Sequence, residues 1–195
     1  KIGHNNFYLS GTMMNKGQIN YNCGNTPDEF DEKKFLSNYK SYNFYNFQGS
    51  TWAPSIVHKD IWNKVGGLSE EYFPGMGSDP DFNMKLWNLG IRIFKGINDF
   101  KVYHFGSIVL RKKINKIIKK NKYGSKSGKI FILKWGISIK FFKEFYLRSN
   151  SKYEGPLLGP KKNLRYYINL LVCKLHYIYL KLFYRKLIKD KSSIL

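Results

Sequence analysis

Two carboxylates at the start of a predicted helix are the residues in this sequence best suited to chemistry. Asp79 and Asp81 lie in the run GSDPD at residues 77–81. A small polar residue, a proline in the first turn and acidic side chains at the positive end of the helix dipole predict a helix over residues 80–89, ended by Gly90. A carboxylate held there stays ionised and oriented, which suits it to acid–base chemistry. The alternative is that Asp79 caps the helix and Asp81 only strengthens its dipole.

The elements around these carboxylates alternate between strands and helices. Short apolar runs predict the strands, and polar caps and terminal glycines predict the helices. This alternation is typical of the α/β class. The expected strands cover residues 7–9, 91–94 and 100–105, and residues 51–57 are expected to form a strand or an extended loop. The expected helices cover residues 33–39, 58–65 and 80–89.

The C-terminal third is expected to be basic and largely helical. Residues 130–146 are aromatic and basic, residues 154–160 read as a Gly/Pro linker, and residues 161–189 predict one long helix. The apolar residues of that helix are spaced in alternating steps of four and three, which places them in one stripe. The stripe comprises Leu164, Ile168, Leu171, Leu175, Ile178 and Leu182.

Two kinds of partner suit this stripe. It packs either on the protein core or a second subunit, or it lies on an anionic membrane, where neighbouring cations add to the burial of apolar area. Tyrosines in the same segment suit a membrane interface. Lys174, His176 and Lys181 interrupt the apolar run, so the helix is not expected to span a bilayer.

The net charge of +21 arises in the second half of the chain. Residues 1–100 hold ten Lys/Arg and ten Asp/Glu, whereas residues 101–195 hold twenty-four and three. Clustered cations attract polyanions, but the interleaved pattern of a nucleic-acid-binding module is missing, so a nucleic-acid partner is not expected. Two cysteines are too few for a disulfide framework, and residues 1–6 do not resemble the start of a secretory signal. We expect a cytoplasmic protein, peripheral at the inner membrane face if residues 160–195 bind there.

Four motifs follow one another in the middle of the chain. They are VGGL at 65–68, GMGSDPDF at 75–82, LWNLG at 86–90 and VYHFGS at 102–107. Their order resembles the acceptor-side half of family 2 glycosyltransferases of GT-A fold, in which a Val-Gly-Gly turn precedes an acidic helix start and a histidine follows. The resemblance covers roughly residues 7–158, and segments within 131–157 resemble the tail of a bacterial and viral subgroup.

The resemblance implies a role for single residues. Asp79 matches the second acidic position of the family's Glu-Asp-x-Asp motif and would be the general base, while Ser78 stands in place of the usual Glu. His104 matches a histidine that helps to hold Mg2+ or Mn2+ beside the sugar-nucleotide diphosphate, and an imidazole can complete a site of oxygen ligands. The alternative is that His104 is a packed, hydrogen-bonded strand residue.

The resemblance also implies acceptor-binding and diphosphate-binding groups. An indole face is a good platform for a sugar ring, although Trp52 suits the core equally well. A basic segment can fold over a diphosphate and neutralise it, although its cations suit a solvated face. The expected acceptor-binding residues are Trp52, Pro54, Met76, Gly77, Ser78 and Asp81, and the expected diphosphate-binding residues are Ser107, Arg111, Lys112 and Lys113.

The family's nucleotide-binding half has no counterpart here, since no Asp-x-Asp motif precedes residue 51. The expected fold is therefore an α/β, GT-A-like (Rossmann-like) sheet represented by its C-terminal half, part of a longer enzyme and inactive alone. We expect residues 1–110 to form that half-domain, 111–158 a basic helical extension closing over the site, and 159–195 an amphipathic basic helix.

The predicted reaction moves a sugar from a nucleotide-sugar donor to a hydroxyl of a saccharide or lipid-linked acceptor, as in polysaccharide biosynthesis. Asp79 and His104 should then open into one cleft at the C-terminal ends of the strands, lined by Trp52. The rival hypothesis is a non-catalytic basic module that binds anionic membrane or nucleic acid. An upstream coding segment with an Asp-x-Asp motif would favour the enzyme.

Overall fold

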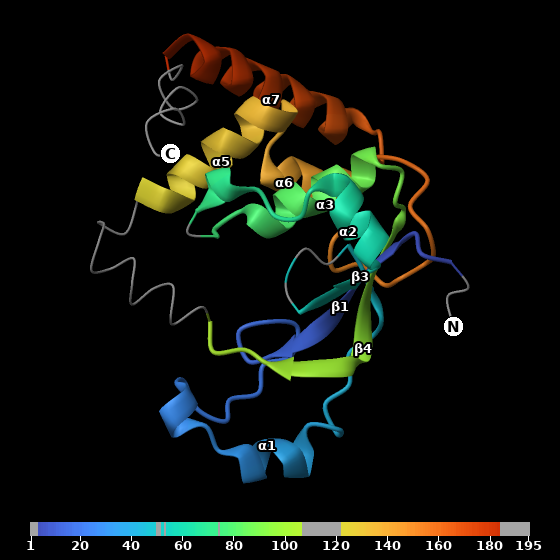
Figure 1. Cartoon of the computed structure of the whole chain (residues 1–195), viewed down its shortest axis with the longest axis vertical. Helices are drawn as coiled ribbons and strands as arrows, with labels where there is room; N and C mark the ends of the chain where they lie inside the picture. The colour runs from blue at the N-terminus through green and yellow to red at the C-terminus, as the bar shows by residue number, and fades with distance from the viewer. Residues whose placement is uncertain (1–3, 50–51, 53, 74, 107–121, 184–195) are drawn as a thin grey trace.

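The computed structural model describes residues 4–49, 52, 54–73, 75–106 and 122–183, which form an open four-stranded sheet with helices around it (Figure 1). The strand order is β2-β4-β1-β3, in which β1 and β4 are parallel and each edge strand is antiparallel to its neighbour. The predicted α/β class is confirmed. The strands are β1 (Phe7–Met14), β2 (Phe47–Gln48), β3 (Ser55–Val57) and β4 (Ile93–Tyr103).

The central pair of strands carries a bulge. The register between β1 and β4 shifts between Gly11 and Thr12, and residues 98–100 of β4 are left without partners in β1. Gly11 is required there because a Cβ atom would lie 2.8 Å from the carbonyl oxygen of Phe100. The prediction of two separate short strands within residues 91–105 was wrong, because β4 crosses the bulge as one strand.

Local end signals place the two helices nearest to the predicted site. Helix α2 (Lys59–Val65) ends at Gly66, whose φ of 72° is a left-handed conformation that glycine adopts cheaply. Helix α3 (Ser78–Asn88) ends just before Gly90, as predicted. The other helical elements are η1 (Pro27–Glu29), α1 (Glu32–Asn38), η2 (Glu70–Tyr72), α5 (Lys122–Trp135), α6 (Ile139–Phe141), the π-helical turn η3 (Phe142–Tyr146) and α7 (Leu164–Phe183).

One hydrophobic core joins the sheet to the C-terminal helices. Phe94 of β4 contacts Trp87 of α3, which in turn contacts Phe142, with ring centroids 6.2 and 6.5 Å apart. Phe141 then contacts Tyr166 of α7 at 5.0 Å. The predicted basic extension therefore shares its core with the sheet where the structure describes it.

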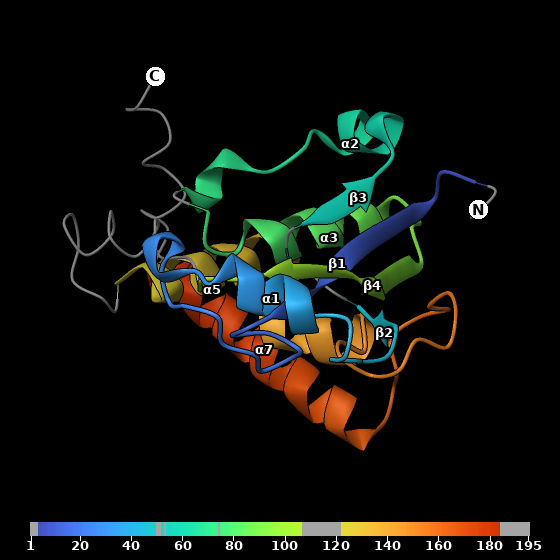
Figure 2. The same cartoon turned by 90° about the horizontal axis from the view of Figure 1, so that it is seen from below.

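Helix α7 packs through a face other than the predicted stripe. Tyr166, Cys173 and Leu180 are buried, whereas every stripe residue between Leu164 and Leu182 exposes 53–77% of its surface. The alternative in which the stripe packs on the core is therefore wrong. Figures 1 and 2 show α7 at the outside of the molecule. None of the helices in the described residues is long and apolar enough to cross a membrane.

Candidate functional site

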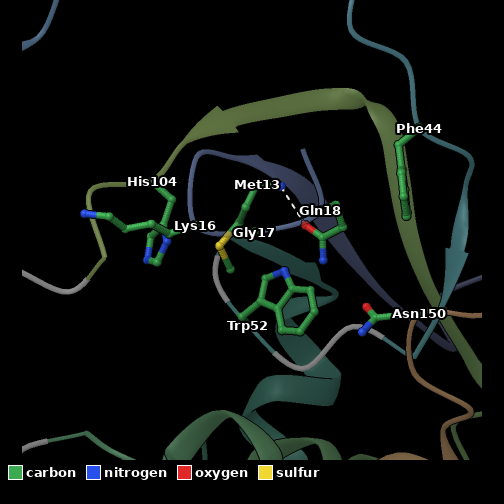
Figure 3. Close-up of a pocket in the computed structure, with 8 residues that line it drawn as sticks. All are labelled: Met13, Lys16, Gly17, Gln18, Phe44, Trp52, His104 and Asn150. Atoms are coloured by element: carbon green, nitrogen blue, oxygen red, sulfur yellow. Dashed lines mark hydrogen bonds between the residues drawn. The ribbon is translucent and has the colours of Figure 1, made fainter. Parts of the chain in front are cut away.

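A pocket opens where the parallel strands β1 and β4 end (Figure 3). Its volume is about 390 Å³, and open α/β sheets place their ligands beyond the carboxyl ends of their strands. Trp52 lies in the middle of the view, with Lys16 and His104 on one side and Phe44 and Asn150 on the other. The lining residues are Met13, Lys16, Gly17, Gln18, Phe44, Trp52, His104 and Asn150.

The turn after β1 brings polar groups to this pocket. Asn15 and Lys16 both adopt left-handed backbone conformations, with φ values of 62° and 54°, so the chain reverses at once. The Oε1 atom of Gln18 accepts a hydrogen bond of 2.9 Å from the backbone N–H of Met13. The Lys16 ammonium donates to the carbonyl of Phe105 at 3.2 Å. These bonds hold an amide and an ammonium group beside the pocket.

Two ring nitrogens at the pocket have no hydrogen-bond partner among the described residues. They are Nε1 of Trp52 and Nδ1 of His104, and both are buried. The backbone N–H of His104 donates to the carbonyl of Met14 at 2.9 Å, which fixes the residue at the end of β4. The Trp52 ring stacks on Phe47, and the Lys143 ammonium lies 5.4 Å from the centre of the Trp52 ring. Because buried polar groups are normally paired, two unpaired nitrogens mark this pocket as a candidate site.

Trp52 and His104 line the same pocket, as the strand-end argument predicts, but Asp79 is not among the lining residues. Tyr8 lies near both Trp52 and Asp79, because it contacts the Trp52 backbone and feels the charge of Asp79. The Tyr8 hydroxyl donates to the backbone carbonyl of Trp52 at 3.4 Å. Burial raises the pKa of the Tyr8 phenol, and the negative charge of Asp79 adds to that rise. Asp79 therefore lies within electrostatic reach of the residue that contacts the Trp52 backbone.

Asp79 occupies the first turn of α3 without capping it. The N-cap position belongs to Gly77, which has a φ of 92°, and no side chain caps the helix. The alternative in which Asp79 is the cap is therefore excluded. Asp79 is largely buried, and this burial raises its pKa to about 6. The carboxylate is thus about half ionised at pH 6 and largely ionised at higher pH, and a base with a pKa near neutrality combines an ionised fraction with useful proton affinity.

The raised pKa of Asp79 predicts a pH-dependent cost in stability. Because its pKa is 3.8 when unfolded and about 6 when folded, its contribution to stability is greatest below the unfolded value and is lost as pH rises through 6. Relative to the unaltered protein, Asp79→Asn should therefore gain about 1 kcal/mol in unfolding free energy between pH 5 and pH 8. Urea unfolding of both proteins at the two pH values measures this. A difference that is constant with pH would contradict the raised pKa.

Asp81 has a structural role. Its side chain is fully buried, and its Oδ2 atom accepts hydrogen bonds from Ser69 Oγ at 2.6 Å and Lys134 Nζ at 3.0 Å. Its Oδ1 atom accepts from Trp135 Nε1 at 2.7 Å. These bonds join α3 to α5. A carboxylate with no exposed surface does not contact an acceptor, so the acceptor-binding role predicted for Asp81 does not fit the structure.

The other residues predicted from the resemblance lie in different settings. Ser78 is buried and its hydroxyl donates to the carbonyl of Gly75 at 2.7 Å. The carbonyl of Pro54 accepts from a backbone N–H of β1 at 3.1 Å. Met76 is exposed and Gly77 is partly exposed in the loop before α3. The predicted diphosphate-binding residues Ser107, Arg111, Lys112 and Lys113 lie outside the described residues.

The metal role predicted for His104 has no complete donor set in the parts of the chain that the structure describes. No group of three His, Cys, Asp or Glu side chains there could hold a metal ion. The described residues thus do not fit the predicted Mg2+ or Mn2+ by themselves, because His104 is not joined by carboxylates.

Sequence reasoning missed most of the pocket. Lys16 and Gln18 flank Gly17 in the turn directly after β1, which ends at Met14, but the strand predicted there ended at residue 9. Phe44 and Asn150 carried no signal, since they reach the pocket from segments more than a hundred residues apart. In the sequence, Tyr8 shows only as part of a predicted apolar strand.

Comparisons of the chain with protein-family models, with curated proteins and with solved structures found no match.

Proposed function

We propose that this chain is the acceptor-side portion of a glycosyltransferase. The observation that carries the proposal is the largely buried carboxylate of Asp79, with a pKa near 6, in the first turn of α3. Asp79 does not line the strand-end pocket, but it lies near Tyr8, whose hydroxyl donates to the backbone carbonyl of Trp52 at the pocket wall. The order of motifs from residue 65 to residue 107 supports the same reading. A base and an aromatic wall are the parts needed to orient a sugar hydroxyl and remove its proton.

In the proposed reaction, an acceptor hydroxyl attacks the anomeric carbon of a nucleotide-sugar donor. Asp79 takes the hydroxyl proton as the new carbon–oxygen bond forms. The bond between the anomeric carbon and the diphosphate oxygen breaks, and the nucleoside diphosphate leaves with the bonding electrons. Lys16 is the described cation at the pocket that is best placed to offset the charge on that leaving group. Asp79 then returns its proton to solvent.

The acceptor in this proposal is a saccharide or a lipid-linked sugar. The Trp52 ring offers a flat apolar surface to one face of a sugar ring. The side-chain amides of Gln18 and Asn150 supply polar groups to the same pocket.

The proposal predicts that Trp52→Ala weakens acceptor use. The full-length enzyme that contains this chain is incubated with UDP-, GDP- and dTDP-sugars and a set of free oligosaccharides, and nucleoside diphosphate release and product mass are measured. At least one donor should give a product heavier by one sugar. Loss of the indole platform should raise the acceptor KM about 10-fold or more, with a smaller effect on kcat.

Trp62→Ala is the matched control, because Trp62 is exposed on α2 and does not line the pocket. Its acceptor KM should equal that of the unaltered protein. Absence of product with every donor would overturn the proposed function. Equal KM values for both tryptophan variants would remove the pocket from acceptor binding.

A further inference from the structure

Helix α7 is attached to the core along one side only. Tyr166, Cys173 and Leu180 are buried, and Tyr166 packs against the rings of Phe141 and Phe145 at 5.0 and 5.4 Å. The Cys173 sulfur accepts a hydrogen bond from the backbone N–H of Ser138 at 3.4 Å. This side of the helix is therefore fixed to α6 and η3.

The opposite side of α7 is an exposed apolar face. At about 100° of rotation per residue, the predicted stripe lies across the helix axis from Cys173 and Leu180. Each of its members exposes more than half of its surface. Four further apolar or aromatic residues widen it on both sides. The α7 outer face comprises Leu164, Tyr167, Ile168, Leu171, Val172, Leu175, Ile178, Tyr179, Leu182 and Phe183.

Cations border the α7 outer face on both sides. Lys174 and Lys181 lie along one edge and Arg165 along the other, and all three are exposed. No acidic residue occurs between residues 164 and 183. Arg165 contacts Glu144 of η3 at 3.0 Å, in a partly exposed pair.

The exposed apolar face of α7 and the cations beside it together indicate which kind of partner this helix binds. A second copy of the chain docked through the same face would bring the two sets of lysines together without any acidic group from α7 to offset them. An anionic lipid surface instead complements the cations while its acyl boundary accepts the apolar side chains. Tyr167 and Tyr179 suit the boundary between the two, since a phenol has an apolar ring and a polar tip. Because α7 is not apolar enough to cross a bilayer, it would lie in the surface plane.

We infer that the α7 outer face docks this protein on an anionic membrane, with the apolar side chains in the acyl boundary and Lys174 and Lys181 among the headgroups. The inference does not depend on the proposed transfer reaction, because no residue of the strand-end pocket contributes to it. It places the protein at the surface where anionic phospholipids lie, whether or not the acceptor is lipid-linked.

Vesicle co-sedimentation tests this docking. The full chain is mixed with vesicles of phosphatidylcholine alone or of phosphatidylcholine with phosphatidylglycerol, at low and high salt. Binding should require phosphatidylglycerol and weaken with salt. The double variant Leu171→Ser/Leu175→Ser should lower the apparent affinity for the mixed vesicles about 10-fold or more. Lys174→Gln/Lys181→Gln should lower it by a similar factor, and only for the anionic vesicles.

Matched controls use equally exposed residues elsewhere. Leu36→Ser/Leu158→Ser changes two exposed leucines outside α7, and Lys33→Gln/Lys59→Gln removes two exposed lysines. Both should bind like the unaltered protein, and all variants should retain the same melting temperature. Binding that ignores anionic lipid, or that the control pairs reduce equally, would overturn the inference. Self-association abolished by the Leu171/Leu175 variant, without vesicle binding, would also overturn it and identify a second copy as the partner.

Discussion

Asp79→Asn in the full-length protein should lower sugar transfer by about 100- to 10,000-fold, the range typical of losing a general base. An amide has nearly the same shape as the carboxylate but does not take a proton from the acceptor hydroxyl. The fold should persist, because Asp79 does not cap α3. The measurement is nucleoside diphosphate release with the donor that gives the highest rate with the unaltered protein.

Asp60→Asn is the control for this experiment. Asp60 also lies in the first turn of a helix, α2, but its side chain is 80% exposed. The Asp60→Asn variant should transfer sugar at a rate within about 2-fold of the unaltered protein, since exposed acids in the first turn of a helix contribute only a small interaction with the helix dipole. Turnover near the unaltered rate in a folded Asp79→Asn protein would remove Asp79 from the mechanism.

Asp81→Asn should destabilise the protein by about 3 kcal/mol, because it removes one partner of a buried ion pair. The Asp81 carboxylate accepts hydrogen bonds from Ser69, Lys134 and Trp135. An amide has one acceptor oxygen in place of two and turns a donor toward groups that already donate. Lys134 retains Glu71 as a partner at 2.9 Å, and this remaining ion pair limits the loss of stability. The midpoint of thermal unfolding should fall by about 6–12 °C.

Asp28→Asn provides the comparison, because Asp28 is exposed in η1 and its loss should change stability by less than about 0.5 kcal/mol. A double-mutant cycle with Lys134→Met then isolates the ion pair. A coupling energy near zero would show that the pair adds nothing beyond its separate groups, and an unchanged midpoint for Asp81→Asn would contradict the structural role.

Local sequence signals were enough to place the helices around the site. The glycines at 66 and 90 and the SDPD run predict the ends of α2 and α3 closely. These signals succeed because caps and left-handed termini act within one helical turn, where sequence neighbours are also spatial neighbours. Strand β4 was split in the prediction because its bulge depends on the partner strand β1.

The different settings of Asp79 and Asp81 came from tertiary structure. The two carboxylates share one local setting, yet two positions along a helix place side chains about 200° apart. Helix α5, distant in sequence, supplies Lys134 and Trp135 on the side of Asp81. Asp79 is left on the side of Tyr8. No signal near residue 80 reveals which side α5 will cover.

Along the rest of the chain, too, features set by neighbouring residues were predictable, and features set by packing between distant segments were not. By itself the sequence determined that a long helix with an apolar stripe lies near the C-terminus, because the spacing is local. Only packing decided that Tyr166, Cys173 and Leu180 meet the core and that the stripe faces outward. Likewise the strand-end pocket unites the turn after β1 with Phe44, Trp52, His104 and Asn150, since a site assembled from distant segments exists only once the sheet has brought their strands side by side.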